Sequence, residues 1–198
     1  MHIVPKFKIE QIALCPANPT KARKLLEDLG LTEWFVDNVH ATGVVRGAVG
    51  ENHALLQFNY QAGNGTDSAA GKPLELELLH YTQGNNWMTK NPNSVSHLGM
   101  HCSAEELEQY RAYFYHNGIG IAQEVNTLAH TNSAIKDTRR YNYAIFDTKD
   151  ILGVDLKFIV RKEYVTPTGA AQGINIQEAL GPVQRAKLPK KNTYKKSK

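Results

Sequence analysis

The feature that most constrains the fold of this chain is an order of secondary-structure signals that occurs twice. Residues 7–81 predict a strand, a helix and three further strands, and residues 93–161 predict the same five elements again. The first strands align as EQIAL with SHLGM, and the last strands as LELEL with VDLKF. A repeat constrains a fold more than local propensity does, although amphipathic strands also resemble one another by chance. We therefore expect an α+β fold in which two βαβββ modules form curved mixed sheets around one cavity.

The two predicted helices have clear boundary signals. Asn18 followed by Pro19 is typical of a helix start, and Gly30 of a helix end. Ser103 and Glu106 have the spacing of a capping box at the start of the second helix. The apolar face of the first helix consists of Ala22, Leu25, Leu26 and Leu29. The predicted strands are Ile9–Leu14, Trp34–Val45, Ala54–Tyr60 and Leu74–Tyr81, then Val95–Cys102, Ile119–Val125, Arg140–Asp147 and Val154–Val160.

The domain boundaries follow from these elements. We expect one domain at residues 1–163, with module one at 7–81, a linker at 82–92 and module two at 93–161, and then a basic C-terminal tail at 164–198. Residues 181–198 carry seven Lys and Arg residues and no acidic residue, so the net charge of +4 leaves about −3 for the rest of the chain. Such a tail is usually a disordered solubilising segment, and nucleic-acid binding through it is the weaker alternative.

Composition and cysteine usage indicate a folded protein of a reducing compartment. Hydrophobic residues make up 41% of the chain and charged residues 21%, as in globular domains. Cys15 and Cys102 stand in short apolar runs, where free buried thiols are more usual than a disulfide. No apolar stretch approaches the ~20 residues of a membrane span, and Met1–Lys8 lacks a signal-peptide core. We expect a cytoplasmic protein with no membrane partner.

The two faces of the predicted strands differ in chemistry, because alternate side chains of a strand point to opposite sides. The even positions are apolar and suit packing under the helices: Ile12, Leu14, Leu74, Leu76, Leu78, Leu98, Met100, Leu156, Phe158 and Val160. The odd positions are polar or small: Gln11, Ala13, Glu75, Glu77, His97, Gly99, His101, Asp155 and Lys157. A polar strand face meets either water or a cavity, and Gln, Glu, His and small residues favour the cavity. These residue types also suit Zn, Ni, Mn or Fe(II), although no compact metal-binding motif is present.

Four segments resemble the vicinal oxygen chelate superfamily, which includes glyoxalases, bleomycin-resistance proteins and extradiol dioxygenases. EQIALCPANPTKARKLLEDLGL is similar to its opening strand and helix, and LELELLHY to its fourth strand. SVSHLGMHCSAEELEQYRAYFYHNGI is similar to the start of its second module, and FDTKDILGVDLKFI to its closing hairpin. The resemblance covers residues 7–81 and 93–161. It implies paired βαβββ modules with one metal-centred, or formerly metal-centred, cavity for a small oxygenated substrate.

The resemblance also implies a divalent metal held by one side chain from the first and last strand of each module. Carried over by position, Gln11, Glu77 and His97 are three of these ligands. The fourth position departs from the family pattern, because the residue four after Gly153 is Lys157 instead of an acid. A protonated ammonium cannot ligate a metal and repels one nearby. Either Asp155 replaces the missing ligand, or three ligands and water suffice, or the metal has been lost and Lys157 pairs with Glu77.

Further residues are candidates for the same cavity. His53 and His101 are expected on its face, and Tyr141 or Tyr143 is expected there depending on which face of its strand points inward. Arg139 precedes this strand. It either binds a carboxylate or phosphate group of the substrate or is simply solvated. The candidate catalytic residues are Asp155, Lys157 and His101, and the candidate substrate-binding residues are His53, Tyr143 and Arg139.

Two functions from different classes are consistent with this sequence. The first is a metal-dependent glyoxalase-like lyase or isomerase, or a dioxygenase, in which the metal stabilises negative charge on a small oxygenated substrate. The second is a metal-free protein that sequesters a small molecule or a nucleotide-like ligand, and Lys157 favours it. A fold alone cannot choose between them. The modules pair within one chain or across a homodimer, since the cavity needs only two facing half-barrels.

Overall fold

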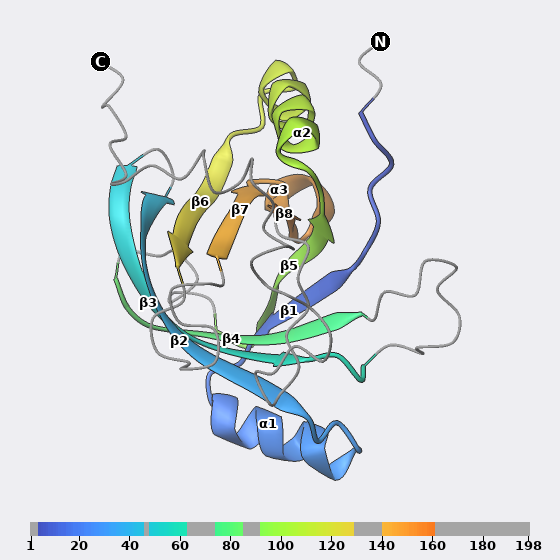
Figure 1. Ribbon diagram of the computed structural model, residues 1–198, viewed down its shortest axis with the longest axis vertical. Helices are drawn as coiled ribbons and strands as arrows, with labels where there is room; N and C mark the ends of the chain where they lie inside the picture. Colours follow the sequence, from blue (N-terminus) through green and yellow to red (C-terminus); the bar gives the residue numbers. More distant parts are fainter. Residues whose placement is uncertain (1–3, 46–47, 63–73, 85–91, 129–139, 161–198) are drawn as a thin grey trace.

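The structure is a computed structural model that describes residues 4–45, 48–62, 74–84, 92–128 and 140–160 (Figure 1). The first half contains β1 (Gln11–Cys15), α1 (Pro19–Asp28), β2 (Trp34–Val45), β3 (Ala48–Asn59) and β4 (Glu75–Gly84). The second half contains β5 (Ser94–His101), α2 (Ala104–His116), β6 (Ile121–Leu128), β7 (Arg140–Phe146), α3 (Lys149–Leu152) and β8 (Asp155–Ile159). The predicted tail at 164–198 lies outside the described residues, and so does most of the linker.

The eight strands form one strongly curved mixed sheet that closes into a barrel, in the order β1-β4-β3-β2-β6-β7-β8-β5. The pairs β1·β4 and β5·β8 are parallel, and the other neighbours are antiparallel. The two halves of the chain meet along two seams, β1·β5 and β2·β6. The expected α+β class and curved mixed sheet are therefore confirmed, and both seams join strands of the same chain. Among the described residues, no helix has both the length and the apolar character needed to cross a membrane.

Local capping signals fix the two longer helices. The Asn18 side chain accepts a hydrogen bond from the Lys21 amide (2.9 Å), and Gly30 after α1 has a positive φ of 97°. At α2, the Ser103 hydroxyl and the Glu106 carboxylate form the reciprocal capping box. The helix positions predicted from these signals are confirmed.

Two elements differ from the prediction. Strand β3 begins at Ala48 rather than Ala54, because β2 pairs with it continuously from Trp34↔Asn59 to Val45↔Ala48. Partner hydrogen bonds therefore hold a polar, glycine-containing segment that has little strand propensity of its own. The short helix α3 was not predicted, and it ends at Gly153 with a φ of 75°.

The apolar residues form three clusters in and around the barrel. Under α1, Trp34, Leu76 and Leu78 pack with Ile12, Leu14, Ala22, Leu26, Leu31 and Val36. Under α2, a cluster that includes Tyr110 and Phe114 packs on Met100, Leu156, Phe158 and Val160. Figure 1 shows the two helices on opposite sides of the barrel. The prediction that even-numbered strand positions pack under the helices is confirmed at these residues. The expected apolar face of α1 is only partly used, because Leu25 and Leu29 are exposed.

The third cluster fills part of the barrel interior and contains Phe35, Val39, Ala54, Leu56, Phe58, Leu79, Tyr81 and Val125. The seam that closes the barrel here requires a glycine. A Cβ atom on Gly43 would lie 2.1 Å from the backbone oxygen of Glu124 on the facing strand. Gly43 therefore allows β2 and β6 to approach closely enough to pair.

Candidate functional site

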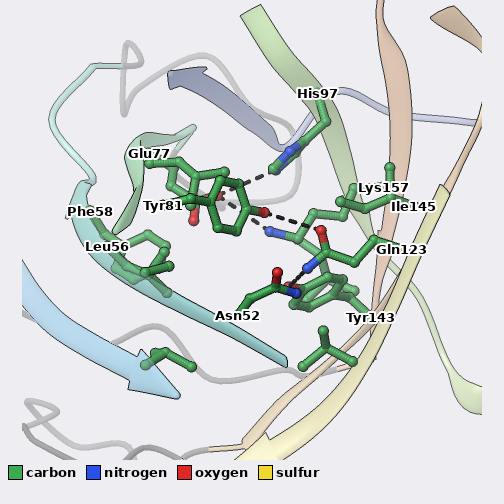
Figure 2. Close-up of a pocket in the computed structure, with 15 residues that line it drawn as sticks. Asn52, Leu56, Phe58, Glu77, Tyr81, His97, Gln123, Tyr143, Ile145 and Lys157 are labelled. Carbon is green, nitrogen blue, oxygen red and sulfur yellow. Dashed lines mark hydrogen bonds and ion pairs between the residues drawn. The ribbon is translucent and has the colours of Figure 1, made fainter. Parts of the chain in front are cut away.

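A cavity of about 550 Å³, counting its open mouth, lies inside the barrel (Figure 2). One part of its wall is apolar: Val39, Ala54, Leu56, Phe58, Leu79, Val125, Ile145 and Ile159. The other part is polar: Asn52, Glu77, Tyr81, His97, Gln123, Tyr143 and Lys157. Both halves of the chain contribute to both parts. A mostly apolar cavity with a few converging polar groups is the usual form of a small-molecule site.

The centre of the polar wall is a buried contact among Lys157, Glu77 and His97. The Lys157 ammonium donates to Glu77 Oε2 across 3.3 Å, and His97 Nε2 lies 3.3 Å from the same oxygen. All three residues are less than 7% exposed. The side chains reach this point from β8, β4 and β5, so the prediction that these odd-numbered positions point inward is confirmed.

Burial and charge set the protonation of this group. Burial on its own would raise the pKa of Glu77, but the Lys157 ammonium and the hydrogen bond with His97 lower it to about 2. Burial, together with the Lys157 charge, lowers the pKa of His97 to about 4, although Glu77 opposes the shift. At neutral pH the group therefore contains one carboxylate, one ammonium and an uncharged imidazole.

The hydrogen bonds around His97 identify its tautomer. Nε2 lies 3.0 Å from Gln11 Oε1 as well as near the Glu77 carboxylate, and both are acceptors. The imidazole therefore carries its proton on Nε2, and Nδ1 accepts from the Ser96 hydroxyl at 2.9 Å. The amide nitrogen of Gln11 in turn donates to Glu75. The polar centre is thus a connected network in which each of these groups has a protein partner.

The packing of Gln11 depends on a glycine directly opposite it in the sheet. Gln11 pairs with Gly99 across β1 and β5. A Cβ atom at Gly99 would lie 2.9 Å from both the Cβ and Oε1 atoms of Gln11. Gly99 therefore makes room for the buried Gln11 side chain.

The three ligand positions expected from the resemblance, Gln11, Glu77 and His97, do converge on one point. The Lys157 ammonium adds a positive charge at the same carboxylate oxygen, which opposes the binding of a divalent ion in this arrangement. Within the described part of the chain, no three His, Cys, Asp or Glu side chains lie close enough together to hold a metal.

A second polar group faces the first inside the cavity. The Tyr81 hydroxyl donates to Gln123 Oε1 (3.2 Å), and Gln123 Nε2 donates to the Tyr143 hydroxyl (2.9 Å). The Lys157 ammonium lies 4.6 Å from the centroid of the Tyr143 ring, in cation–π geometry. Burial raises the pKa of both tyrosines well above 10, so both phenols stay protonated and act as hydrogen-bonding groups at neutral pH. Tyr143 lines the cavity, as expected for one of the two tyrosines of this strand.

The Asn52 amide is a buried polar group that the described residues leave without a partner. It is only 2% exposed and lines the cavity from β3, and neither its amide nitrogen nor its amide oxygen has a hydrogen-bond partner among the residues that the structure describes. Leaving a buried polar group unsatisfied costs about 1–3 kcal/mol. Figure 2 shows this side chain among the groups that point into the cavity.

Two candidate catalytic residues, Asp155 and His101, are not among the residues that line the cavity. Asp155 is fully buried, and its Oδ1 atom accepts from the Lys149 amide at the start of α3 (3.1 Å). His101 binds Glu10 through both its backbone nitrogen (2.8 Å) and Nδ1 (3.0 Å). Both residues have the strand parity that was predicted. Their side chains bind Glu10 and the Lys149 amide and do not line the cavity, so the expectation that they are cavity residues is not met.

The candidate substrate-binding residue His53 does not line the cavity either. His53 lies between the cavity-lining residues Asn52 and Ala54, so its side chain belongs to the other face of β3. The expectation that His53 faces the cavity is therefore wrong. The regular pairing with β2 keeps the even positions of β3 on the inward face from Asn52 to Phe58. Arg139 lies outside the described residues.

Sequence reasoning missed three cavity residues: Asn52, Tyr81 and Gln123. Tyr81 continues the inward parity of Glu77 along β4, so this signal was available. Gln123 is followed directly by the charged Glu124 in β6, so the composition of this strand gave no comparable signal.

No protein-family model and no curated protein sequence matches this chain. The vicinal oxygen chelate assignment therefore still depends on the four resembling segments and remains a prediction. The lining of the cavity suits a small, largely apolar molecule. Polar groups of such a molecule would meet an ammonium, two phenols and two amides of the protein.

Proposed function

We propose that this chain is a metal-free protein that binds and sequesters a small molecule, built on the paired βαβββ modules of the vicinal oxygen chelate superfamily. The module assignment is supported by the strand ring, in which β1-β4-β3-β2 is followed by β6-β7-β8-β5. By their order in each half of the chain, β1 to β4 correspond to β5 to β8. The second half of the ring therefore repeats the strand order of the first half in reverse. Each half also has its parallel pair between its first and last strands.

The observation that carries the proposal is the ion pair between Lys157 and Glu77 (3.3 Å). It places a positive charge next to the carboxylate that would otherwise bind the metal, so the charge of Glu77 is already neutralised. The remaining wall is apolar and contains neutral hydrogen-bonding groups, which suits binding by exclusion of water. Of the two alternatives for the sequence, this arrangement favours the binder.

Metal binding by matched variants at Lys157 tests the metal-free part of the proposal. The unmutated protein, stripped with chelator and incubated with Zn²⁺, Ni²⁺, Mn²⁺ or Fe²⁺, should retain less than stoichiometric metal. Lys157→Glu supplies the fourth ligand, an acid, and should bind about one ion per chain, whereas Lys157→Gln removes the charge without adding a carboxylate. Elemental analysis after gel filtration gives the ratio.

A cavity-filling variant tests small-molecule binding. Acetophenone, an uncharged aromatic ketone, serves as the probe, and calorimetry or ligand-observed NMR measures its affinity. Ala54→Leu adds bulk to the cavity wall and should weaken binding at least about tenfold, or ~1.4 kcal/mol. Ala48→Leu, on an exposed part of the same strand, is the matched control and should leave binding unchanged. Equal weakening by both variants would contradict a ligand site inside the barrel.

One specific observation favours the second candidate, a metal-dependent enzyme. Gln11 Oε1 and Glu77 Oε2 both lie within 3.3 Å of His97 Nε2, as three ligands of one ion would require after small shifts. If this candidate is right, the unmutated protein holds about one metal ion per chain. The His97→Ala variant should then lose the metal but keep its fold. That result in the metal experiment would overturn the metal-free proposal.

A further inference from the structure

The cavity contains a hydrogen-bonding group that the protein itself does not use. Both polar atoms of the Asn52 amide are buried and have no partner in the described part of the chain, while the side chain lines the cavity. The neighbouring inward positions on the same strand, Ala54, Leu56 and Phe58, are all apolar. An amide among such residues is unfavourable for folding unless something in the cavity binds it.

Charge in the cavity restricts what can bind there. Of the residues that line it, Glu77 and Lys157 carry opposite charges in direct contact, so the wall is close to neutral overall. An anionic or cationic ligand would bring an uncompensated charge into a buried site, or would have to break this ion pair. An uncharged ligand avoids both penalties.

The two atoms of the Asn52 amide specify the complementary group. A carboxamide offers one acceptor and two donors in a plane, and the group that satisfies it best is another amide with its N–H and C=O on the same side. Primary carboxamides and lactams have this arrangement, whereas ketones offer only an acceptor and carboxylates are charged. The apolar wall formed by Leu56, Phe58 and Val125 suits a hydrocarbon or aromatic body attached to that group.

We propose that Asn52 is the specificity-determining residue of the cavity, and that the ligand is an uncharged molecule with a primary carboxamide or lactam edge on an apolar body. The inference rests on the proposed small-molecule-binding function and names the ligand class of that site. Figure 2 shows Asn52 pointing into the same cavity as Gln123 and Tyr143, so the ligand edge enters a wall of neutral hydrogen-bonding groups.

Three probes of nearly equal size test the inference: benzamide, acetophenone and benzoate. Benzamide has donor and acceptor, acetophenone lacks the donor, and benzoate carries a charge. The full-length protein should bind benzamide at least about tenfold more tightly than either of the others, measured by calorimetry. In Asn52→Leu and in Asn52→Ala the benzamide affinity should fall to that of acetophenone. Asn38→Leu, an exposed position on β2, should keep the preference.

The outcomes separate this inference from the function on which it rests. If acetophenone and benzamide bind the unmutated protein equally well, or if both Asn52 variants keep the preference for benzamide, the role of Asn52 is wrong and the binding function stands. If none of the probes binds, the binding function fails and the inference fails with it. Since the Asn52 side chain makes no hydrogen bond to the residues that the structure describes, its replacement should leave the melting temperature unchanged or raise it. A folded Asn52→Ala protein suffices if Asn52→Leu is poorly folded.

Discussion

Lys157 Nζ lies 3.3 Å from Glu77 Oε2 in the interior of the barrel, where the two residues join the last strand of each half of the chain. In the family that the sequence resembles, an acid at the position of Lys157 and the carboxylate of Glu77 would together bind a metal ion. Here an ammonium neutralises the carboxylate directly. The first prediction concerns the energetic consequence of separating this pair.

Lys157→Met should destabilise the protein by about 3–5 kcal/mol, because it leaves the Glu77 carboxylate buried without its counter-charge. The double variant Lys157→Met/Glu77→Gln should recover much of this loss, because no charge then remains in the apolar interior. Urea unfolding at pH 7 in the presence of chelator measures the free energy of unfolding of the single and the double variant. If the double variant is no more stable than the single one, Lys157 stabilises the fold through packing and not through the ion pair.

The second prediction is a pH effect that originates at His97. Its pKa in the folded state is lowered to about 4, below the usual ~6.5 of the unfolded chain, so between these values the unfolded state binds an extra proton. His97 therefore makes the free energy of unfolding fall as pH drops from about 6.5 to 4, by up to ~1.4 kcal/mol per pH unit. His97→Gln should remove this slope, and urea unfolding at half-unit pH intervals will detect the difference. Identical pH profiles for both proteins would contradict the buried neutral imidazole.

Asp155 produces the opposite pH effect over nearly the same range. Burial and the nearby charge of Asp147 raise the pKa of Asp155 from about 3.8 to about 6. The folded state therefore holds the extra proton, and the stability from this group is lost as pH rises through 6. Asp155→Asn keeps an oxygen that can accept from the Lys149 amide, and it should stabilise the protein at pH 7 by roughly 1–3 kcal/mol. Equal or lower stability at pH 7 would show that the carboxylate is well accommodated when charged.

The last prediction concerns closure of the barrel at the β2·β6 seam. Gly43→Ala should destabilise the protein by at least about 1–3 kcal/mol, because the new Cβ atom would collide with the Glu124 backbone oxygen, which cannot move without opening the seam. Gly120→Ala is the matched control, since a Cβ atom there meets no other atom within 4 Å. Thermal unfolding of both variants should show a clear drop in melting temperature only for Gly43→Ala.

The sequence by itself determined the local structure and the inward direction of several site residues. The caps at Asn18 and Ser103 act over three or four residues, so they can be recognised without knowledge of the fold. Alternation along β4, β5 and β8 placed Glu77, His97 and Lys157 on one face, because the neighbouring positions of the other face are mostly apolar: Leu76, Leu78, Leu98, Leu156 and Phe158. Cys15 and Cys102 are free and buried, as expected from their apolar neighbours.

Only the tertiary structure decided which residues meet in the cavity. Strand β3 has polar side chains on both faces near His53, so alternation could not show that Asn52 points inward, and pairing with β2 and β4 set its face. Asp155 has inward parity, yet the α3 amide at Lys149 binds it. Periodicity specifies the relative faces of a strand. The absolute direction of a side chain, and the partner that it finds there, depend on contacts between segments far apart in the sequence.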